Sequence, residues 1–161
     1  MKNFILISLT FFLALSLSII PMPLDMLWLR PAWVALTLIY WVIMMPNQIN
    51  VGIAWMLGLL MDLLNGTFLG EYALVLALMA FFTVKLQRQL RLFPLLQQMM
   101  WLFLFILVYQ FLLFIIQGIS GQLILNWQFW LVPVSSMLLW PILKPLLQNY
   151  QQRFTIYTHS S

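Results

Sequence analysis

Residues 95–116, LLQQMMWLFLFILVYQFLLFII, decide the class of this protein, because the stretch holds no charged side chain. As an α-helix rising about 1.5 Å per residue, it is long enough to cross a hydrocarbon core of roughly 30 Å. The rest of the chain has the same character, with 65% hydrophobic and 6% charged side chains among 161 residues. A soluble domain would carry roughly a quarter charged residues. The sequence therefore predicts one compact integral membrane domain.

Five other apolar stretches, separated by proline, glycine and asparagine, complete a predicted all-α polytopic fold of about six short transmembrane helices. The predicted spans are residues 4–20, 31–45, 51–64, 71–84, 95–116 and 127–143, followed by an amphipathic cytoplasmic tail at 144–161. The second and third spans are short, since about 15 residues cover only ~22 Å. They must thin the bilayer, recruit flanking residues or be shielded by other helices. Pro133 predicts a bend in the sixth span.

The basic side chains predict the orientation, because Lys and Arg near span ends accumulate on the cytoplasmic side. With both termini in the cytoplasm, the basic residues on the cytoplasmic side are Lys2, Lys85, Arg88, Arg91, Lys144 and Arg153. Arg30 is then external. The first apolar stretch is not followed by a small-residue cleavage site, so we interpret it as an uncleaved first span.

Composition argues against several kinds of chemistry. There is no cysteine, and the single histidine, His159, lies near the C-terminus, so we expect no thiol chemistry and no metal site. The basic residues form no dense face for nucleic acid. Asp62 and Glu71 have side chains suited to acid and base catalysis, but no activating base, metal triad or phosphate-binding loop accompanies them. We therefore expect no enzymatic activity and no cofactor.

Asp62 needs an explanation, because an ionisable group within a transmembrane helix costs about 2.5 to 3.5 kcal/mol on insertion scales. Three interpretations remain open: it pairs with Arg30 at the same depth, faces water in an external vestibule, or contacts a partner helix. Glu71 opens the fourth predicted helix, where a carboxylate complements the positive end of the helix dipole. Ala54 and Gly58 form a pair of small residues that permits close helix packing.

The predicted inner surface carries basic residues and an amphipathic tail. Its basic members are Lys85, Arg88, Arg91, Lys144 and Arg153. In the tail, apolar residues recur at helical spacing and glutamines fill the other face, which indicates an interfacial helix. This helix either lies on lipid headgroups or docks to a cytoplasmic partner. The basic residues and the tail are candidates for binding either anionic membrane lipid or cytoplasmic proteins.

Residues 58–70, GLLMDLLNGTFLG, together with Arg30 and Pro31 before the second span, have a recognisable family pattern. The chain resembles the bacterial family of rod shape-determining membrane proteins, MreD, in this pattern, in length and in hydropathy. The residues that carry the resemblance, or that are candidates for structural or partner-binding roles, are Arg30, Pro31, Gly58, Asp62, Gly66, Gly70 and Glu71.

The resemblance implies a non-enzymatic subunit of the cell-elongation complex in the bacterial inner membrane. Members act with the bitopic protein MreC, the actin-like MreB, the glycosyltransferase RodA and the elongation-specific penicillin-binding protein to direct lateral peptidoglycan synthesis. The family is also similar in helix arrangement to the substrate-binding subunits of vitamin transporters, so the alternative is a small-molecule-binding transporter subunit. The predicted outer loops offer few polar side chains for a ligand cavity, which favours the scaffold.

Overall fold

The computed structural model describes residues 2–20, 31–121 and 130–156. At residues 2, 3, 151 and 153–156 it describes the backbone but not the side chains. Within these residues the chain is helical, and it contains α1 (Lys2–Ile19), α2 (Trp33–Met44), α3 (Val51–Asn65), α4 (Glu71–Leu92), α5 (Leu95–Ile119) and α6 (Val132–Ile156). The prediction of an all-α fold with six helices is confirmed.

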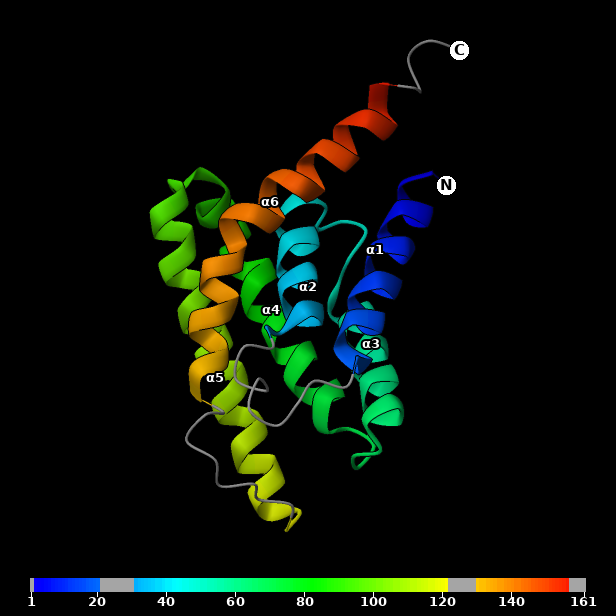
Figure 1. Ribbon diagram of the computed structural model, residues 1–161, viewed down its shortest axis with the longest axis vertical. Helices are drawn as coiled ribbons and strands as arrows, with labels where there is room; N and C mark the ends of the chain where they lie inside the picture. Colours follow the sequence, from blue (N-terminus) through cyan, green and yellow to red (C-terminus); the bar gives the residue numbers. More distant parts are fainter. Residues whose placement is uncertain (1, 21–30, 122–129, 157–161) are drawn as a thin grey trace.

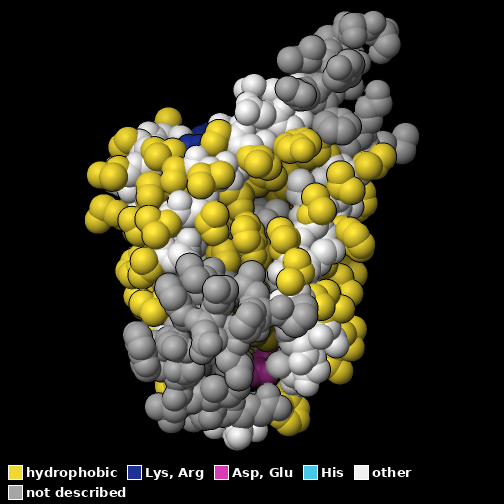
Figure 2. Space-filling model, in the orientation of Figure 1, with side chains coloured by type: hydrophobic (Ala, Val, Ile, Leu, Met, Phe, Trp, Pro, Cys, Tyr) yellow, Lys and Arg dark blue, Asp and Glu magenta, His cyan; other side chains and the backbone are white. Residues whose placement is uncertain are grey.

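Consecutive helices run in opposite directions, so that α1 begins and α6 ends at the same end of the bundle (Figure 1). The described charged side chains separate between the two ends, with an apolar surface between them (Figure 2). We call the end with Lys85, Arg88, Arg91 and Lys144 the basic end, and the end with Asp62 and Glu71 the acidic end. This separation is typical of proteins whose charges lie outside a hydrocarbon layer.

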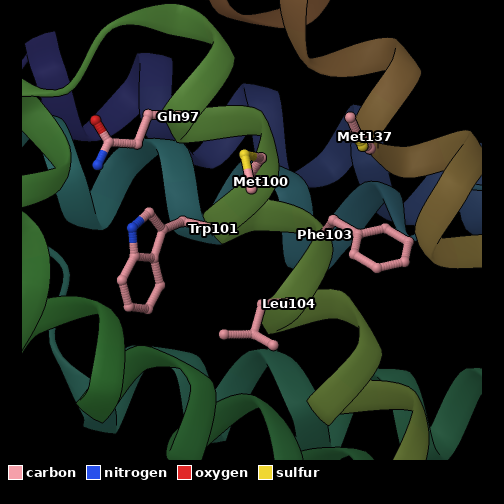
Figure 3. Close-up of a pocket in the computed structure, with 6 residues that line it drawn as sticks. All are labelled: Gln97, Met100, Trp101, Phe103, Leu104 and Met137. Carbon is pink, nitrogen blue, oxygen red and sulfur yellow. The ribbon is translucent and has the colours of Figure 1, made fainter.

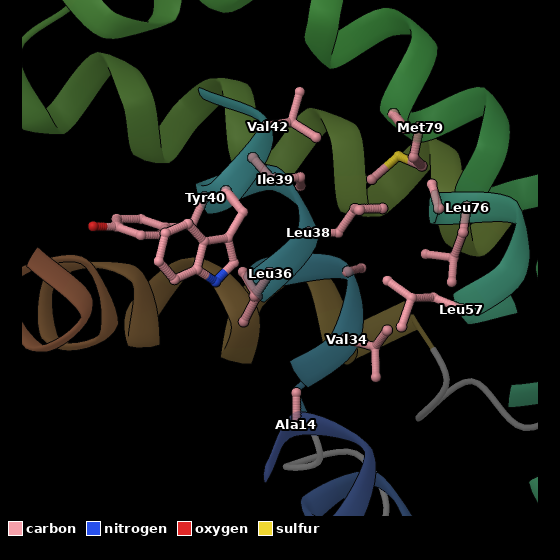
Figure 4. Packing of buried hydrophobic residues seen from close by; sticks show 14 of the residues in the cluster. Ala14, Val34, Leu36, Leu38, Ile39, Tyr40, Val42, Leu57, Leu76 and Met79 are labelled. Carbon is pink, nitrogen blue, oxygen red and sulfur yellow. The ribbon is translucent and has the colours of Figure 1, made fainter. Parts of the chain in front are cut away.

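The short helix α2 lies at the centre of the bundle. Ten consecutive residues, from Val34 to Ile43, are buried, and the helix packs against α1, α4 and α6. Figure 4 shows its side chains pointing in several directions into neighbouring helices. A helix that is hydrophobic on all sides is stable in such a position. The short second span was expected to thin the bilayer, recruit flanking residues or be shielded by other helices. For α2, shielding by other helices applies.

Two helices continue beyond the ends of the predicted spans. The fourth helix continues through the basic segment to Leu92, eight residues beyond the predicted end, because Lys, Arg, Gln and Leu are good helix formers. It ends before Pro94, which disfavours helical geometry at Phe93. The sixth helix and the predicted tail form one continuous helix in the described residues, up to Ile156.

The predicted bend at Pro133 was wrong in position. Pro133 lies in the first turn of α6, where a missing amide hydrogen costs no intrahelical hydrogen bond. The prolines inside the helix are Pro141 and Pro145. In Figure 1 the second half of α6 leans away from the bundle axis beyond this region, as internal prolines favour.

Within the described ranges, two helices, α4 and α5, are long and apolar enough to cross a membrane. Three others are apolar but shorter: Phe4–Ile19, Trp33–Met44 and Val51–Asn65. Large apolar side chains on the outside include Phe12 of α1, Leu63 of α3 and Leu104 of α5. The described surface is therefore of the kind that faces lipid or another protein.

Candidate functional site

Helices α3 and α4 form the most closely packed pair in the bundle, and Gly58 lies at their contact. A Cβ atom added to Gly58 would be 2.5 Å from the Ala73 amide nitrogen and 2.6 Å from the Tyr72 carbonyl oxygen. Such distances leave no room for a side chain, since both neighbours are backbone atoms. Ala54, one turn earlier, is also fully buried. The predicted pair of small residues thus serves packing within this chain.

Asp62 lies one turn after Gly58, and its carboxylate binds the first turn of α4. Oδ1 accepts hydrogen bonds from the Tyr72 amide at 2.8 Å and the Thr67 hydroxyl at 3.2 Å. Oδ2 accepts from the Gly70 amide at 2.8 Å and the Ala73 amide at 3.4 Å. Helices normally receive such bonds from a side chain at the N-cap position. Here the N-cap is a glycine, so Asp62 supplies the cap from the preceding helix.

The main chain of Asp62 ends α3. Its carbonyl oxygen accepts hydrogen bonds from the amides of Gly66 and Thr67, the latter at 3.1 Å. Gly66 has φ +66°, the left-handed geometry that ends many helices. Gly70 has φ +110°, which side-chain-bearing residues rarely adopt. One residue therefore terminates α3 with its carbonyl and begins α4 with its carboxylate, and the glycines give the turn its shape.

These contacts explain how a fully buried carboxylate is accommodated at Asp62. The amides at a helix N-terminus carry partial positive charge and stabilise an anion. An ionised carboxylate has about four acceptor positions, and four described donors bind here. Arg30 lies outside the described residues, so its pairing with Asp62 stays a prediction.

Glu71 is the first residue of α4 and is 2% exposed. Neither of its carboxylate oxygens has a hydrogen-bond partner among the described residues. Glu71 lies at the positive end of the α4 dipole, as the sequence predicted. The capping hydrogen bonds, however, come from Asp62, whose like charge acts on Glu71.

At the basic end, Arg91 of α4 binds the C-terminus of α2. Its guanidinium donates to the carbonyl oxygens of Ile43 at 2.5 Å and Met44 at 3.0 Å. A cation at a helix C-terminus complements the negative end of the dipole. Lys85 is exposed and lies 4.5 Å from the centre of the Phe81 ring. The predicted basic surface is thus partly used for internal contacts.

Gln98 of α5 joins three helices at the same end. Its amide nitrogen donates to the carbonyl oxygens of Leu90 at 2.7 Å and Phe93 at 3.1 Å, where α4 ends. Its amide oxygen accepts from the Lys144 ammonium of α6 at 2.6 Å. Sequence reasoning did not single out Gln98, since a glutamine in an apolar helix gives no indication of which carbonyl it will bind.

Two other polar contacts between helices were also missed. The Ser136 hydroxyl of α6 accepts from the Ala32 amide at 3.1 Å, directly before α2. The Trp41 indole donates to the Thr10 hydroxyl of α1 at 2.8 Å. Together with Arg91, these contacts attach α2 to three neighbouring helices at both of its ends.

The structure brings five of the candidate residues together in the α3–α4 hairpin: Gly58, Asp62, Gly66, Gly70 and Glu71. Pro31 is buried two residues before α2. Arg30 and the side chain of Arg153 fall outside the described residues. Among described side chains, no group of three or more His, Cys, Asp or Glu residues could hold a metal ion.

The helical bundle, its apolar outside and the separation of charge define a helical protein of membrane type. Over residues 1–150 the sequence matches the family described as rod shape-determining protein MreD. It is 32% identical over 147 residues to the rod shape-determining protein MreD of Haemophilus influenzae, covering 91% of each chain. The chain belongs to the MreD family, and its role lies in rod-shape determination. No solved structure matches it, so the likeness to vitamin-transporter subunits stays a prediction.

Proposed function

We propose that this protein is a non-enzymatic membrane scaffold of the bacterial cell-elongation complex. The observation that carries the proposal is the set of hydrogen bonds on Asp62. The carboxylate is used to fix one helix against the next, and a rigid hairpin of this kind is a suitable platform for a partner helix. Binding to a preorganised surface costs less conformational entropy than binding to a mobile one.

The proposed topology has six spans in the inner membrane, with both termini in the cytoplasm. The basic end, with Lys85, Arg88, Arg91 and Lys144, is then cytoplasmic, as the distribution of Lys and Arg favours. The acidic end with Asp62 faces the periplasm. This arrangement makes the α3–α4 turn available to the periplasmic side of a bitopic protein.

The outer face of the hairpin offers the contact surface. Large side chains that are at least 46% exposed in the isolated chain include Trp55, Met56, Leu60, Leu63, Phe68 and Leu69. Since lipid tails are as apolar as these side chains, binding there depends on close packing and lipid release. The proposed partner is the bitopic protein MreC. MreB, RodA and the elongation-specific penicillin-binding protein are the proposed further members of the complex.

Site-specific crosslinking tests the proposal. A photoreactive residue is placed in turn at Leu60, Leu63 and Phe68 in living cells, with Phe111 on the exposed side of α5 as the matched control. We expect a discrete adduct with a single-span membrane protein from the hairpin positions and a weaker or different product from the control.

Labelling of lipid alone from every hairpin position would refute this interface. Co-purification of the chain with a bound small molecule, and without membrane partners under conditions that preserve other complexes, would instead support the transporter subunit.

A further inference from the structure

The α3–α4 hairpin presents only a short apolar length to its surroundings. Helix α3 has 15 residues, which span about 22 Å at 1.5 Å per residue. Its outer side carries large apolar side chains that are at least 46% exposed: Trp55, Met56, Leu60, Leu63 and Leu64. Unlike α2, this helix is therefore not shielded on its outer side by the described residues of the chain.

Non-helical turns with exposed residues lie at both ends of α3. Asn47, Gln48 and Asn50 are exposed before the helix begins, and Asn65 and Gly66 are exposed where it ends. Irregular backbone that faces lipid does not occur within the hydrocarbon region, because its amides and carbonyls would lack hydrogen-bond partners. Both turns must therefore lie outside the hydrocarbon, so the apolar layer along α3 is no thicker than about 22 Å.

Helix α4 gives the same length independently. The turn before it ends at Gly70, and the next exposed charge is Lys85, about 22 Å further along the helix. The Lys85 ammonium lies 4.5 Å from the centre of the Phe81 ring, one helical turn back towards the acidic end. Because a charge within hydrocarbon is costly, this cation limits the apolar layer. We call residues 51–65 and 71–84 the hairpin belt.

The opposite side of the bundle is different. Helix α5 lies across the bundle from α3 (Figure 1). It has 25 residues and no charged side chain, and it spans about 37 Å. Exposed apolar residues follow it from Leu96 through Leu104 to Ile119, and Figure 3 shows Leu104 with Met100 and Phe103 along this helix. The apolar surface is thus much shorter on the hairpin side than on the α5 side.

An ordinary hydrocarbon core of about 30 Å is thicker than the hairpin belt by roughly 8 Å. A short span is accommodated by a thinner bilayer, by long flanking side chains that reach the interface, or by oligomerisation. Helix α3 contains no Lys or Arg that could reach outward. Tilting the helix would only shorten the layer further. For the isolated chain, a thinner bilayer is the solution that remains.

We propose that the hairpin belt keeps the bilayer locally thin and recruits phospholipids with short acyl chains, whereas α5 contacts lipid of ordinary length. The inference rests on the proposed six-span topology, but not on the scaffold role. A partner helix that covered the belt would release this thinned lipid. The mismatch would then favour assembly, which apolar contact alone does not do in lipid.

Fluorescence quenching tests the proposal. Because the chain has no cysteine, single cysteines can carry a fluorescent label. Leu60→Cys on α3 and Leu104→Cys on α5 are a matched pair, since these leucines are 46% and 48% exposed. The labelled full chain is placed in bilayers that mix phosphatidylcholines with chains of about 14 and about 22 carbons, one of them brominated so that it quenches on contact. At Leu60 we expect the short lipid to quench about twofold more than its share of the mixture predicts, and at Leu104 we expect no such enrichment.

Exchanging the brominated lipid controls for effects of the label. Equal enrichment of the short lipid at both positions, or enrichment at neither, would overturn the proposal and leave the topology intact. Absence of quenching by either lipid at both positions would overturn the topology and the proposal with it, because the labels would then lie outside the membrane. The scaffold role is tested separately, by the crosslinking in cells.

Access of water to the two turns gives an independent result. Gln48→Cys and Asn65→Cys place a thiol beside each end of α3, and Leu104→Cys places one in the apolar layer. In bilayers with chains of about 22 carbons, we expect a water-soluble maleimide to react at both turns at comparable rates and not at Leu104. Protection of either turn would overturn the proposal, because that end of α3 would then lie within a bilayer of undisturbed thickness.

Discussion

Replacement of Asp62 by asparagine is the sharpest test of the hairpin. Asparagine keeps one acceptor oxygen and places an NH₂ donor where the other oxygen stood. Two of the four donors on the carboxylate then lose their acceptor: either the Thr67 hydroxyl and the Tyr72 amide, or the amides of Gly70 and Ala73.

The expected loss follows from these bonds. Each stranded buried donor costs about 1–3 kcal/mol. The bond to Ala73 is long, at 3.4 Å, and removing the charge relieves the repulsion with Glu71. We therefore expect Asp62→Asn to lower the free energy of unfolding by about 2–4 kcal/mol. The assay is unfolding of the purified chain in mixed micelles, followed by circular dichroism.

Glu71→Gln is the matched control, since it removes the neighbouring buried carboxylate without removing a described hydrogen bond. We expect its free energy of unfolding to stay within about 1 kcal/mol of the unmodified chain. A loss below about 0.5 kcal/mol for Asp62→Asn, or equal losses for the two variants, would refute the capping role of Asp62.

Three further substitutions test other contacts, each by thermal or denaturant unfolding. Gly58→Ala should cost about 1–3 kcal/mol, because the new Cβ would collide with the backbone of α4. Gly70→Ala should cost about 1–3 kcal/mol, because φ +110° strains a residue with a side chain. Arg91→Met should cost about 1.5–3 kcal/mol, since the last carbonyls of α2 lose a charged donor.

Matched variants separate these causes from general sensitivity. Gly52→Ala lies on the same helix as Gly58, but its new Cβ would meet only a side-chain oxygen at 3.3 Å, so the stability should hold. Arg88→Met removes an exposed cation and should leave unfolding unchanged. If either control falls as far as its partner, the contact assigned to that partner is not the cause. Unaltered unfolding of Gly70→Ala would contradict the strain at that turn.

The apolar pattern was enough to predict the helices, because long uncharged stretches have few other stable structures in a membrane. The ends were harder to predict. The basic segment at the end of α4 has the composition of an interfacial loop and also of a helix, and Pro94 decides between them. Pro133 was assigned a bend because the start of α6 could not be located from composition.

Asp62 could be predicted as a candidate residue, because placing an ionisable side chain in a transmembrane helix costs free energy. Its partners were not predicted, because they are backbone amides that come within reach only when the turn has closed. Backbone donors carry no sequence signal at a particular position. Gly58 was identified as a site of close packing, but the sequence could not show that α4 occupies it. The role of Gln98 could not be predicted either, because its amide binds backbone carbonyl oxygens, which every residue carries.

The double use of Asp62 has a consequence for biosynthesis. When α3 has been made and the chain beyond Gly66 has not, the carboxylate lacks every amide that binds it in the finished protein. An ionised carboxylate then disfavours entry of α3 into lipid, by at most about 2.5–3.5 kcal/mol, which is the cost at the centre of a transmembrane helix. The penalty disappears once the amides at the start of α4 donate hydrogen bonds to the carboxylate. We therefore expect the translocon to release α3 and α4 together, as one insertion unit.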